Sequence, residues 1–336
     1  MYLEQTLIQE VPFAINKLHK LHCLLAYYFD DNMDISLNIL RGVKIHGSIG
    51  CLKALGNLRY VDANLGGVKL VEDLRKFSQL KDLGMVNLTK ETGRALCTSI
   101  ENMNSLTDLY VSLINEDEVV DLQPISSPPK CLRKLSMKGC LAKLPDWISK
   151  LQHLVSKNFY WTRLSDDPLN AFQNLPNLAE LILEMEACNG EQLQIRKGGF
   201  PKLKVLGLAD LTELISLNIY KEALPLLEKL SIERCPQLME VPFGVQHLRN
   251  LSEVIFTDMP SEFEQSLDPK QGSHYWIIEH VPFIFLCHKV WKGIFGYETH
   301  NLDSKYLERS KGTTINQADD TNNNNGDDIN ASDDKG

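Results

Sequence analysis

Residues 203–208 read LKVLGL, and residues 178–183 and 227–232 repeat the same spacing as LAELIL and LEKLSI. In each segment an aliphatic residue stands at the first, fourth and sixth positions. The two-residue step at the end of the motif is typical of a β-strand, because alternate side chains of a strand point to opposite faces. These segments therefore predict short strands with aliphatic side chains on one face and mostly polar side chains on the other.

The motif recurs along most of the chain. Its first residue is a leucine nine times, at positions 58, 80, 106, 132, 154, 178, 203, 227 and 251. Adjacent copies lie 22 to 26 residues apart, and 26 of the 27 motif positions are apolar, far more than the 43% hydrophobic composition would supply by chance. A repeat of about 20–29 residues with the pattern L-x-x-L-x-L is the signature of leucine-rich repeats.

We therefore expect an α/β fold, a leucine-rich-repeat solenoid shaped like a horseshoe. Short parallel strands would line its concave face, and helical or irregular turns its convex face. One repeat cannot cover its own apolar face, so neighbouring repeats must stack. A Leu-rich helical solenoid is the alternative. Prolines at positions 145, 201, 225, 236 and 242, among others, argue against it, because proline interrupts helices.

One motif position is not apolar. Lys157 stands between Leu154 and Phe159, where the repeat requires an aliphatic side chain. A buried lysine is costly unless it is paired or reaches solvent. The sequence therefore predicts a frayed or degenerate repeat here, with a functional lysine as the alternative.

The pattern divides the chain into three parts. About ten repeats occupy residues 1–260, where 48 of the 52 leucines lie, and a longer gap before the copy at Leu58 predicts an insertion near residues 27–47. Residues 261–309 lose the repeat and are expected to form a C-terminal cap, in which HYWIIEHVPFIF is interpreted as a closing strand. Residues 310–336 have no aromatic residue and contain NNNNGDD, which predicts a disordered acidic tail.

Composition limits the classes of function. The chain carries 35 Lys+Arg against 44 Asp+Glu, a net charge of −9, which argues against nucleic-acid binding because phosphate contacts need a basic face. No apolar stretch approaches the roughly 20 residues that span a bilayer, although VPFIFLCHKVWKGIFGY leaves a membrane-surface role as an alternative. Eight cysteines without a C-x-x-C pair predict reduced thiols in a cytoplasmic protein.

Motifs of catalysis and metal binding are missing from the sequence. The chain has no G-x-S-x-G, no H-E-x-x-H and no phosphate-binding G-x-x-x-x-G-K-[ST]. His19 and His22 form a close pair without a carboxylate at ligand spacing. We therefore expect no enzymatic activity, no cofactor and no metal.

The expected functional surface is the concave face of the strands. Positions that flank the central motif residue point outward there, and several carry the Tyr, Trp and Arg side chains that often dominate protein interfaces. The candidate protein-binding residues are Arg59, Tyr60, Asp82, Asp108, Tyr110, Arg133, Lys134, Lys138, Tyr160 and Trp161. The basic cluster in residues 133–138 predicts an acidic partner surface.

Five longer segments carry a family resemblance. They are ISSPPKCLRKLSMKG, LPDWISKLQHLV, YWTRLSDDPLNAFQNLPNLAELIL, GGFPKLKVLGLADL and CPQLMEVPFGVQHLRNLSEVIFTDMP. The chain resembles, over most of residues 1–300, the repeat region of plant intracellular nucleotide-binding, leucine-rich-repeat disease resistance proteins of the coiled-coil class. The resemblance implies a horseshoe repeat domain that senses pathogen effectors or restrains its own nucleotide switch, and an intracellular location.

The chain also departs from that family. The family places a coiled coil and a nucleotide-binding switch before the repeats, whereas this chain begins inside the repeats, so we expect a fragment and do not carry ATP binding over. The expected partner is a protein: a pathogen effector, a guarded host protein or a nucleotide-binding switch domain. The alternative is a leucine-rich-repeat scaffold or regulatory protein that assembles signalling enzymes or a ubiquitin ligase.

Overall fold

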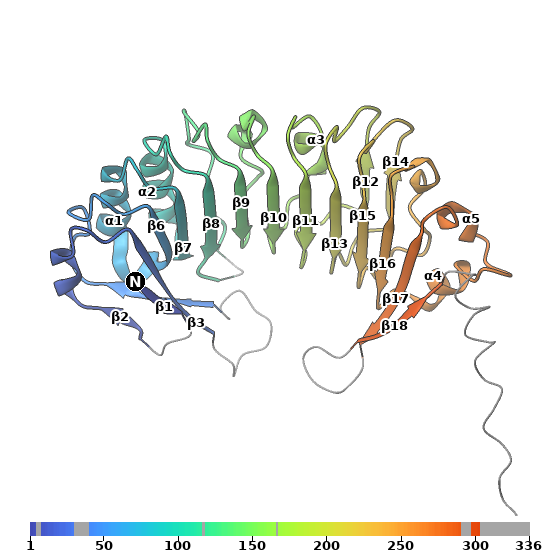
Figure 1. The fold of residues 1–336 in the computed structure, drawn as a ribbon, viewed down its shortest axis with the longest axis horizontal. Helices are drawn as coiled ribbons and strands as arrows, with labels where there is room; N and C mark the ends of the chain where they lie inside the picture. The colour runs from blue at the N-terminus through green and yellow to red at the C-terminus, as the bar shows by residue number, and fades with distance from the viewer. Residues whose placement is uncertain (5–7, 30–39, 116–117, 166, 290–296, 303–336) are drawn as a thin grey trace, which may run out of the picture.

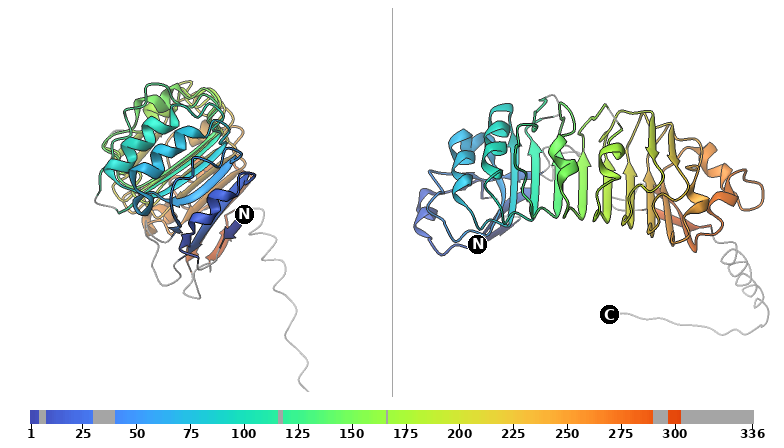
Figure 2. Two further views of the ribbon diagram at one scale, coloured as in Figure 1. Left: turned by 90° about the vertical axis from the view of Figure 1, so that its left-hand side faces the viewer. Right: turned by 90° about the horizontal axis from the view of Figure 1, so that it is seen from above.

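The fold is mixed α/β and is built on one large, mostly parallel sheet that runs along the molecule (Figure 1). Helices α1, α2 and α3 lie on one side of this sheet (Figures 1 and 2). The computed structural model describes residues 1–4, 8–29, 40–115, 118–165, 167–289 and 297–302.

Within the described residues the large sheet has 14 strands, and their spatial order follows their order along the chain except that β4 lies beside β3. The strands are β1 (Tyr2–Glu4), β3 (Cys23–Phe29), β4 (Leu40–Gly42), β6 (Asn57–Asp62), β7 (Asp82–Leu88), β8 (Asp108–Leu113), β9 (Lys134–Lys138), β10 (Ser156–Tyr160), β11 (Glu180–Glu184), β13 (Val205–Ala209), β15 (Lys229–Glu233), β16 (Glu253–Thr257), β17 (Phe283–Lys289) and β18 (Tyr297–Asn301). Two small sheets pair β2 (Glu10–Val11) with β5 (Lys44–Ile45) and β12 (Gln192–Ile195) with β14 (Ser216–Ile219).

Helical segments fill several of the turns between strands. They are α1 (Ala63–Asp73), α2 (Lys90–Ile100), α3 (Leu169–Phe172), α4 (Ser261–Ser266), α5 (Tyr275–Ile278) and the 3-10 helices η1 (Phe13–Lys17), η2 (Leu74–Lys76), η3 (Asp146–Lys150) and η4 (Val245–His247). At the start of α2, the side chains of Thr89 and Thr92 each accept a hydrogen bond from the other's backbone N–H. This capping box satisfies N–H groups that the first helical turn cannot pair.

From β7 to β16 the strand register agrees with the repeat spacing read from the sequence. The motif copy assigned to start at Leu58 is wrong, because Leu58 lies opposite Leu83, the fourth motif position of the next copy, and not opposite Leu80. Leu206 of β13 lies opposite Leu181 of β11 on one side and Leu230 of β15 on the other. All three side chains are fully buried. Equivalent positions therefore form a continuous aliphatic column, in which each repeat covers the apolar face of the next.

Lys157 belongs to this column. It lies in β10 opposite Leu135 and Leu181, and its side chain is fully buried. The prediction of a frayed repeat is wrong, because all five residues of β10 pair in register with both neighbouring strands. Those backbone pairings keep the repeat regular although one core position is a lysine.

The insertion expected near residues 27–47 contributes one strand to the large sheet. β3 pairs with β6 at its start and with the antiparallel β4 at its end. Residues 30–39, the middle of the insertion, lie outside the described residues. The insertion thus widens the sheet beside β6.

The C-terminal segment extends the sheet and then reverses it. β17 pairs with β16 in parallel, and β18 pairs with β17 antiparallel. The expected closing strand HYWIIEHVPFIF is only partly a strand, because its first half forms α5, which buries Ile277 and Ile278. Pro282, which cannot donate a backbone hydrogen bond, separates this helix from β17. Residues 310–336, expected to be a tail, lie outside the described residues.

Two further features bear on the sequence-based expectations. All eight cysteines are free thiols, of which Cys97, Cys188 and Cys235 are buried and Cys51 and Cys131 are exposed. No described helix has the length and apolar character needed to cross a bilayer.

Candidate functional site

The open face of the large sheet is the face that bears Lys134, Ser136 and Lys138 of β9. Leu135 and Met137, which alternate with them, are buried. This alternation follows from the pleat, because successive side chains of a strand point to opposite faces. Since neighbouring strands are parallel and in register, the open-face side chains form rows across the sheet.

One row carries charged side chains from neighbouring strands. Asp108 of β8 is the register partner of Asp82 on β7 and of Lys134 on β9. Arg59 of β6 reaches Asp82, with Nε 2.6 Å from Oδ1. Burial raises the pKa of Asp82 above its usual value, and the Arg59 guanidinium opposes that shift. The structure thus places four of the predicted residues in one contiguous group.

Three tyrosines form an aromatic cluster at the N-terminal end of the open face. The ring centroid of Tyr60 lies 4.7 Å from that of Tyr27 and 5.7 Å from that of Tyr110. Tyr60 has a φ of +65°, and the register of β6 with β7 shifts between Leu58 and Val61. This bulge re-aims Tyr60 toward the other two rings. Burial raises the pKa of Tyr110 to about 12.

A basic group borders the aromatic cluster. Lys134 and Lys138 project from β9, and the exposed Arg133 precedes that strand. The Lys138 Nζ lies 4.8 Å from the Trp161 ring centroid, a cation–π contact. Tyr160 of β10 is the register partner of Lys138. The remaining predicted residues therefore lie on or next to the adjacent strands β9 and β10.

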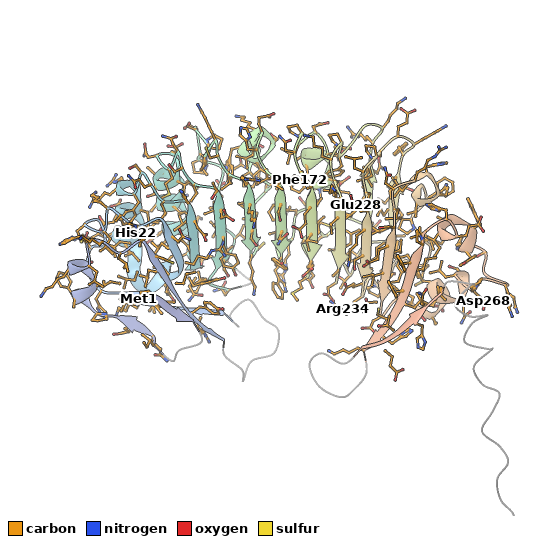
Figure 3. All side chains as sticks on the ribbon, viewed as in Figure 1. Met1, His22, Phe172, Glu228, Arg234 and Asp268 are labelled. Carbon is orange, nitrogen blue, oxygen red and sulfur yellow. The ribbon has the colours of Figure 1, made fainter. Side chains whose placement is uncertain are left out.

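The residues predicted from the sequence leave out the C-terminal half of the open face. Glu184 ends β11 there, and burial, followed by the charges of Glu233 and Asp210, raises its pKa above the usual value. Arg234 binds Asp210 side-on, with Nε and Nη2 2.7 and 2.8 Å from the two carboxylate oxygens. Figure 3 labels Arg234 near the lower ends of the strands. The repeat itself was the signal, because the outward positions of the later strands include Glu180, Glu184, Glu233 and Glu253.

The described residues offer no obvious place for a metal ion. No group of three or more His, Cys, Asp or Glu side chains among them could hold one. Away from the large sheet, an apolar groove of about 370 Å³ is lined by β14, residues 237–243 and residues at α5. Ile215, Met239 and Phe243 line this groove and are exposed. The groove adds an apolar patch separate from the open face.

The repeat geometry agrees with the comparison to known families. The sequence model of a family described as a leucine-rich repeat region matches residues 1–266. The chain belongs to this leucine-rich repeat family. The matched residues begin before β1 and end at α4, so the leucine-rich repeats include every residue predicted for the binding surface.

This leucine-rich repeat chain is similar to several proteins of Arabidopsis thaliana. Disease resistance protein RPM1 is 26% identical over 265 residues, which cover 79% of this chain and 28% of RPM1. Disease resistance protein RPP8 is 26% identical over 230 residues, 68% of this chain and 25% of RPP8. Probable disease resistance protein RF45 is 28% identical over 232 residues, 67% of this chain and 22% of RF45. The chain therefore spans less than a third of the length of these relatives.

Proposed function

We propose that this chain is the protein-recognition region of a plant immune receptor, folded as a horseshoe-shaped solenoid whose open, concave face binds another protein. Similarity to disease resistance proteins over two thirds or more of the chain supports the immune role. The observation that carries the binding role is the open face itself. Its aromatic, basic and acidic side chains stand on adjacent strands of one sheet.

Recognition by such a sheet needs little reorganisation. The side chains are attached to paired strands and many already contact one another, so few rotamers are lost when a partner binds. The cluster of Tyr27, Tyr60 and Tyr110 offers aromatic contact area. Aromatic and arginine side chains are the ones that most often dominate binding energy. The aromatic cluster and the neighbouring basic group are therefore the proposed anchors.

The partner is proposed to present an acidic surface. Arg133, Lys134 and Lys138 form a basic group that would complement it, and charge complementarity favours both the rate and the specificity of association. A pathogen effector, a guarded host protein and the nucleotide-binding switch domain of the same receptor are the partners considered, all of them in the cytoplasm. The chain would contribute recognition and no catalysis.

A charge-reversal experiment tests this function. Tagged wild type and the double variant Arg133→Glu, Lys134→Glu are expressed in plant tissue, and the co-purifying proteins are identified by mass spectrometry. The double variant should lose a receptor-domain or effector partner by about ten-fold or more, with little change in thermal stability, because both side chains are exposed.

The matched control makes the same charge change away from the open face. Lys143→Glu, Lys150→Glu alters two exposed lysines, one shortly before η3 and one at its end, and should retain the partner. Equal binding by all three proteins would remove the basic group from the proposed interface. Capture dominated by ubiquitin-ligase subunits would instead favour the scaffold alternative.

A further inference from the structure

The column of core side chains is interrupted once, at Lys157. Leu135 and Leu181 are its register partners, and both are aliphatic and buried. The Lys157 side chain has no exposed surface, and its Nζ has no hydrogen-bond partner among the residues that the structure describes. A primary amine therefore occupies a place where the neighbouring repeats stack methyl groups.

Aromatic rings surround the amine. The Lys157 Nζ lies 2.9 Å from the ring centroid of Phe172 in α3 and 4.4 Å from that of Phe159 in β10. The two rings stack on each other at 5.5 Å between centroids. Burial, the sole cause, lowers the pKa of Lys157 well below its usual value. The faces of the rings partly stabilise a positive charge on the amine. Neither the rings nor the described strands supply a hydrogen-bond acceptor or a negative charge for it.

The consequence for the repeats follows from their stacking. Each repeat contacts only its neighbours, so the stability of the whole is close to a sum of repeat and interface contributions. A buried polar group without a partner lowers the contribution of its own repeat. Local opening occurs first where that contribution is smallest. Opening at β10 would give the Lys157 amine access to water, which the closed repeat denies it.

We propose that the repeat array opens locally at β10, separating strands β6–β9 from strands β11–β16, and that Lys157 sets the frequency of this opening. The opening is a property of the fold alone. Its consequence for recognition rests on the proposed function: the open face would be divided between Lys138 of β9 and Glu184 of β11. A protein bound across these strands would hold the array closed.

Hydrogen exchange measured by mass spectrometry on the full chain tests the proposal. In the wild type, backbone amides of β10 and α3 should exchange about ten-fold or more faster than those of β9 and β11, since one pKa unit of penalty corresponds to a factor of ten. Lys157→Met replaces the amine with an apolar side chain of similar length. It should slow exchange at β10 and α3 to the rate of their neighbours.

Two further variants control the comparison. Lys134→Met removes an exposed lysine from β9 and should leave exchange unchanged. Lys157→Leu checks that the slowing does not depend on methionine. Equal exchange in β9, β10 and β11 of the wild type would overturn the proposal, and so would unchanged exchange at β10 in both Lys157 variants. Neither result depends on partner capture, so failure here is distinguishable from failure of the proposed function.

Discussion

Arg234 joins two neighbouring repeats by binding Asp210 through two parallel hydrogen bonds, from Nε to Oδ1 and from Nη2 to Oδ2. The two residues occupy equivalent positions, because each directly follows its strand, β15 or β13, and each has a positive φ, of 47° and 53°. The Nη1 atom of Arg234 also lies 3.3 Å from Oε2 of Glu233. One guanidinium thus offsets two carboxylates at this edge of the open face.

Removing this guanidinium should change the titration of a third carboxylate. Burial is the main reason that the pKa of Glu184 is raised, the charges of Glu233 and Asp210 add to it, and Arg234 opposes it. Arg234→Gln should therefore raise the pKa of Glu184 further, as measured by carbon NMR titration of the carboxyl group. Stability should fall by no more than about 1 kcal/mol, because the pair is partly exposed.

A lysine on the same face provides the control for that measurement. Lys229→Gln removes a lysine whose Nζ lies 2.6 Å from a Glu253 oxygen on the same face. Because Lys229 is not among the causes of the Glu184 shift, the pKa of Glu184 should stay constant in this variant. A lower pKa of Glu184 in Arg234→Gln would contradict the electrostatic account.

Lys157→Met should stabilise the fold in a pH-dependent way. At pH 7 we expect a gain of about 2–4 kcal/mol in the free energy of unfolding, because an unpaired amine leaves the core. Burial lowers the folded-state pKa of Lys157, so the unfolded chain holds this proton more tightly and the wild type gains stability as the pH rises. The advantage of the variant should therefore shrink as the pH rises from 7 to 10.

Chemical denaturation of both proteins at several pH values measures this difference. Other titrating groups are common to both proteins and largely cancel. A variant advantage that stays constant with pH would mean that Lys157 is protonated in the folded state. A loss of stability in Lys157→Met would mean that the amine makes favourable contacts in the core.

The aliphatic register could be predicted from the sequence because burial alone decides it. Leu181, Leu206 and Leu230 recur at a nearly constant spacing. Because the repeats stack, these side chains must point into the core that the neighbouring repeats share. The same register gave the open-face positions of Asp108 and Lys134. It located Lys157 in the core but not its surroundings, since a periodic pattern says which face a side chain takes and not whether the repeat deforms around it.

The environment of Tyr60 could not be predicted from the repeat. Arg59 and Tyr60 are adjacent, and a regular strand would send them to opposite faces. Both reach the open face because the bulge in β6 adds a residue. In addition, the Tyr60 carbonyl accepts a hydrogen bond from the N–H of Val43, which follows β4. This contact comes from the insertion, whose path the repeat pattern does not specify.

When the native protein is treated with iodoacetamide, exposed thiols should be alkylated and buried thiols should not. Burial raises the pKa of Cys97 and Cys188 to about 12 and that of Cys235 to about 11. The thiolate is the reactive form, so these three should remain unlabelled while the exposed Cys51 and Cys131 react. Peptide mass spectrometry reads the result. Rapid labelling of Cys188 or Cys235 would contradict the packing of their repeats.

Tyr60 allows backbone strain and ring contacts to be measured separately. Its φ of +65° is unfavourable for any residue with a Cβ, by about 1 kcal/mol relative to glycine. Tyr60→Ala loses the contacts with Tyr27 and Tyr110 and keeps the strain, whereas Tyr60→Gly loses the same contacts and relieves the strain. We therefore expect Tyr60→Ala to be less stable than Tyr60→Gly by about 1 kcal/mol in urea denaturation. The reverse order would mean that this position leaves the left-handed region in solution, and the aromatic cluster would then lose its structural basis.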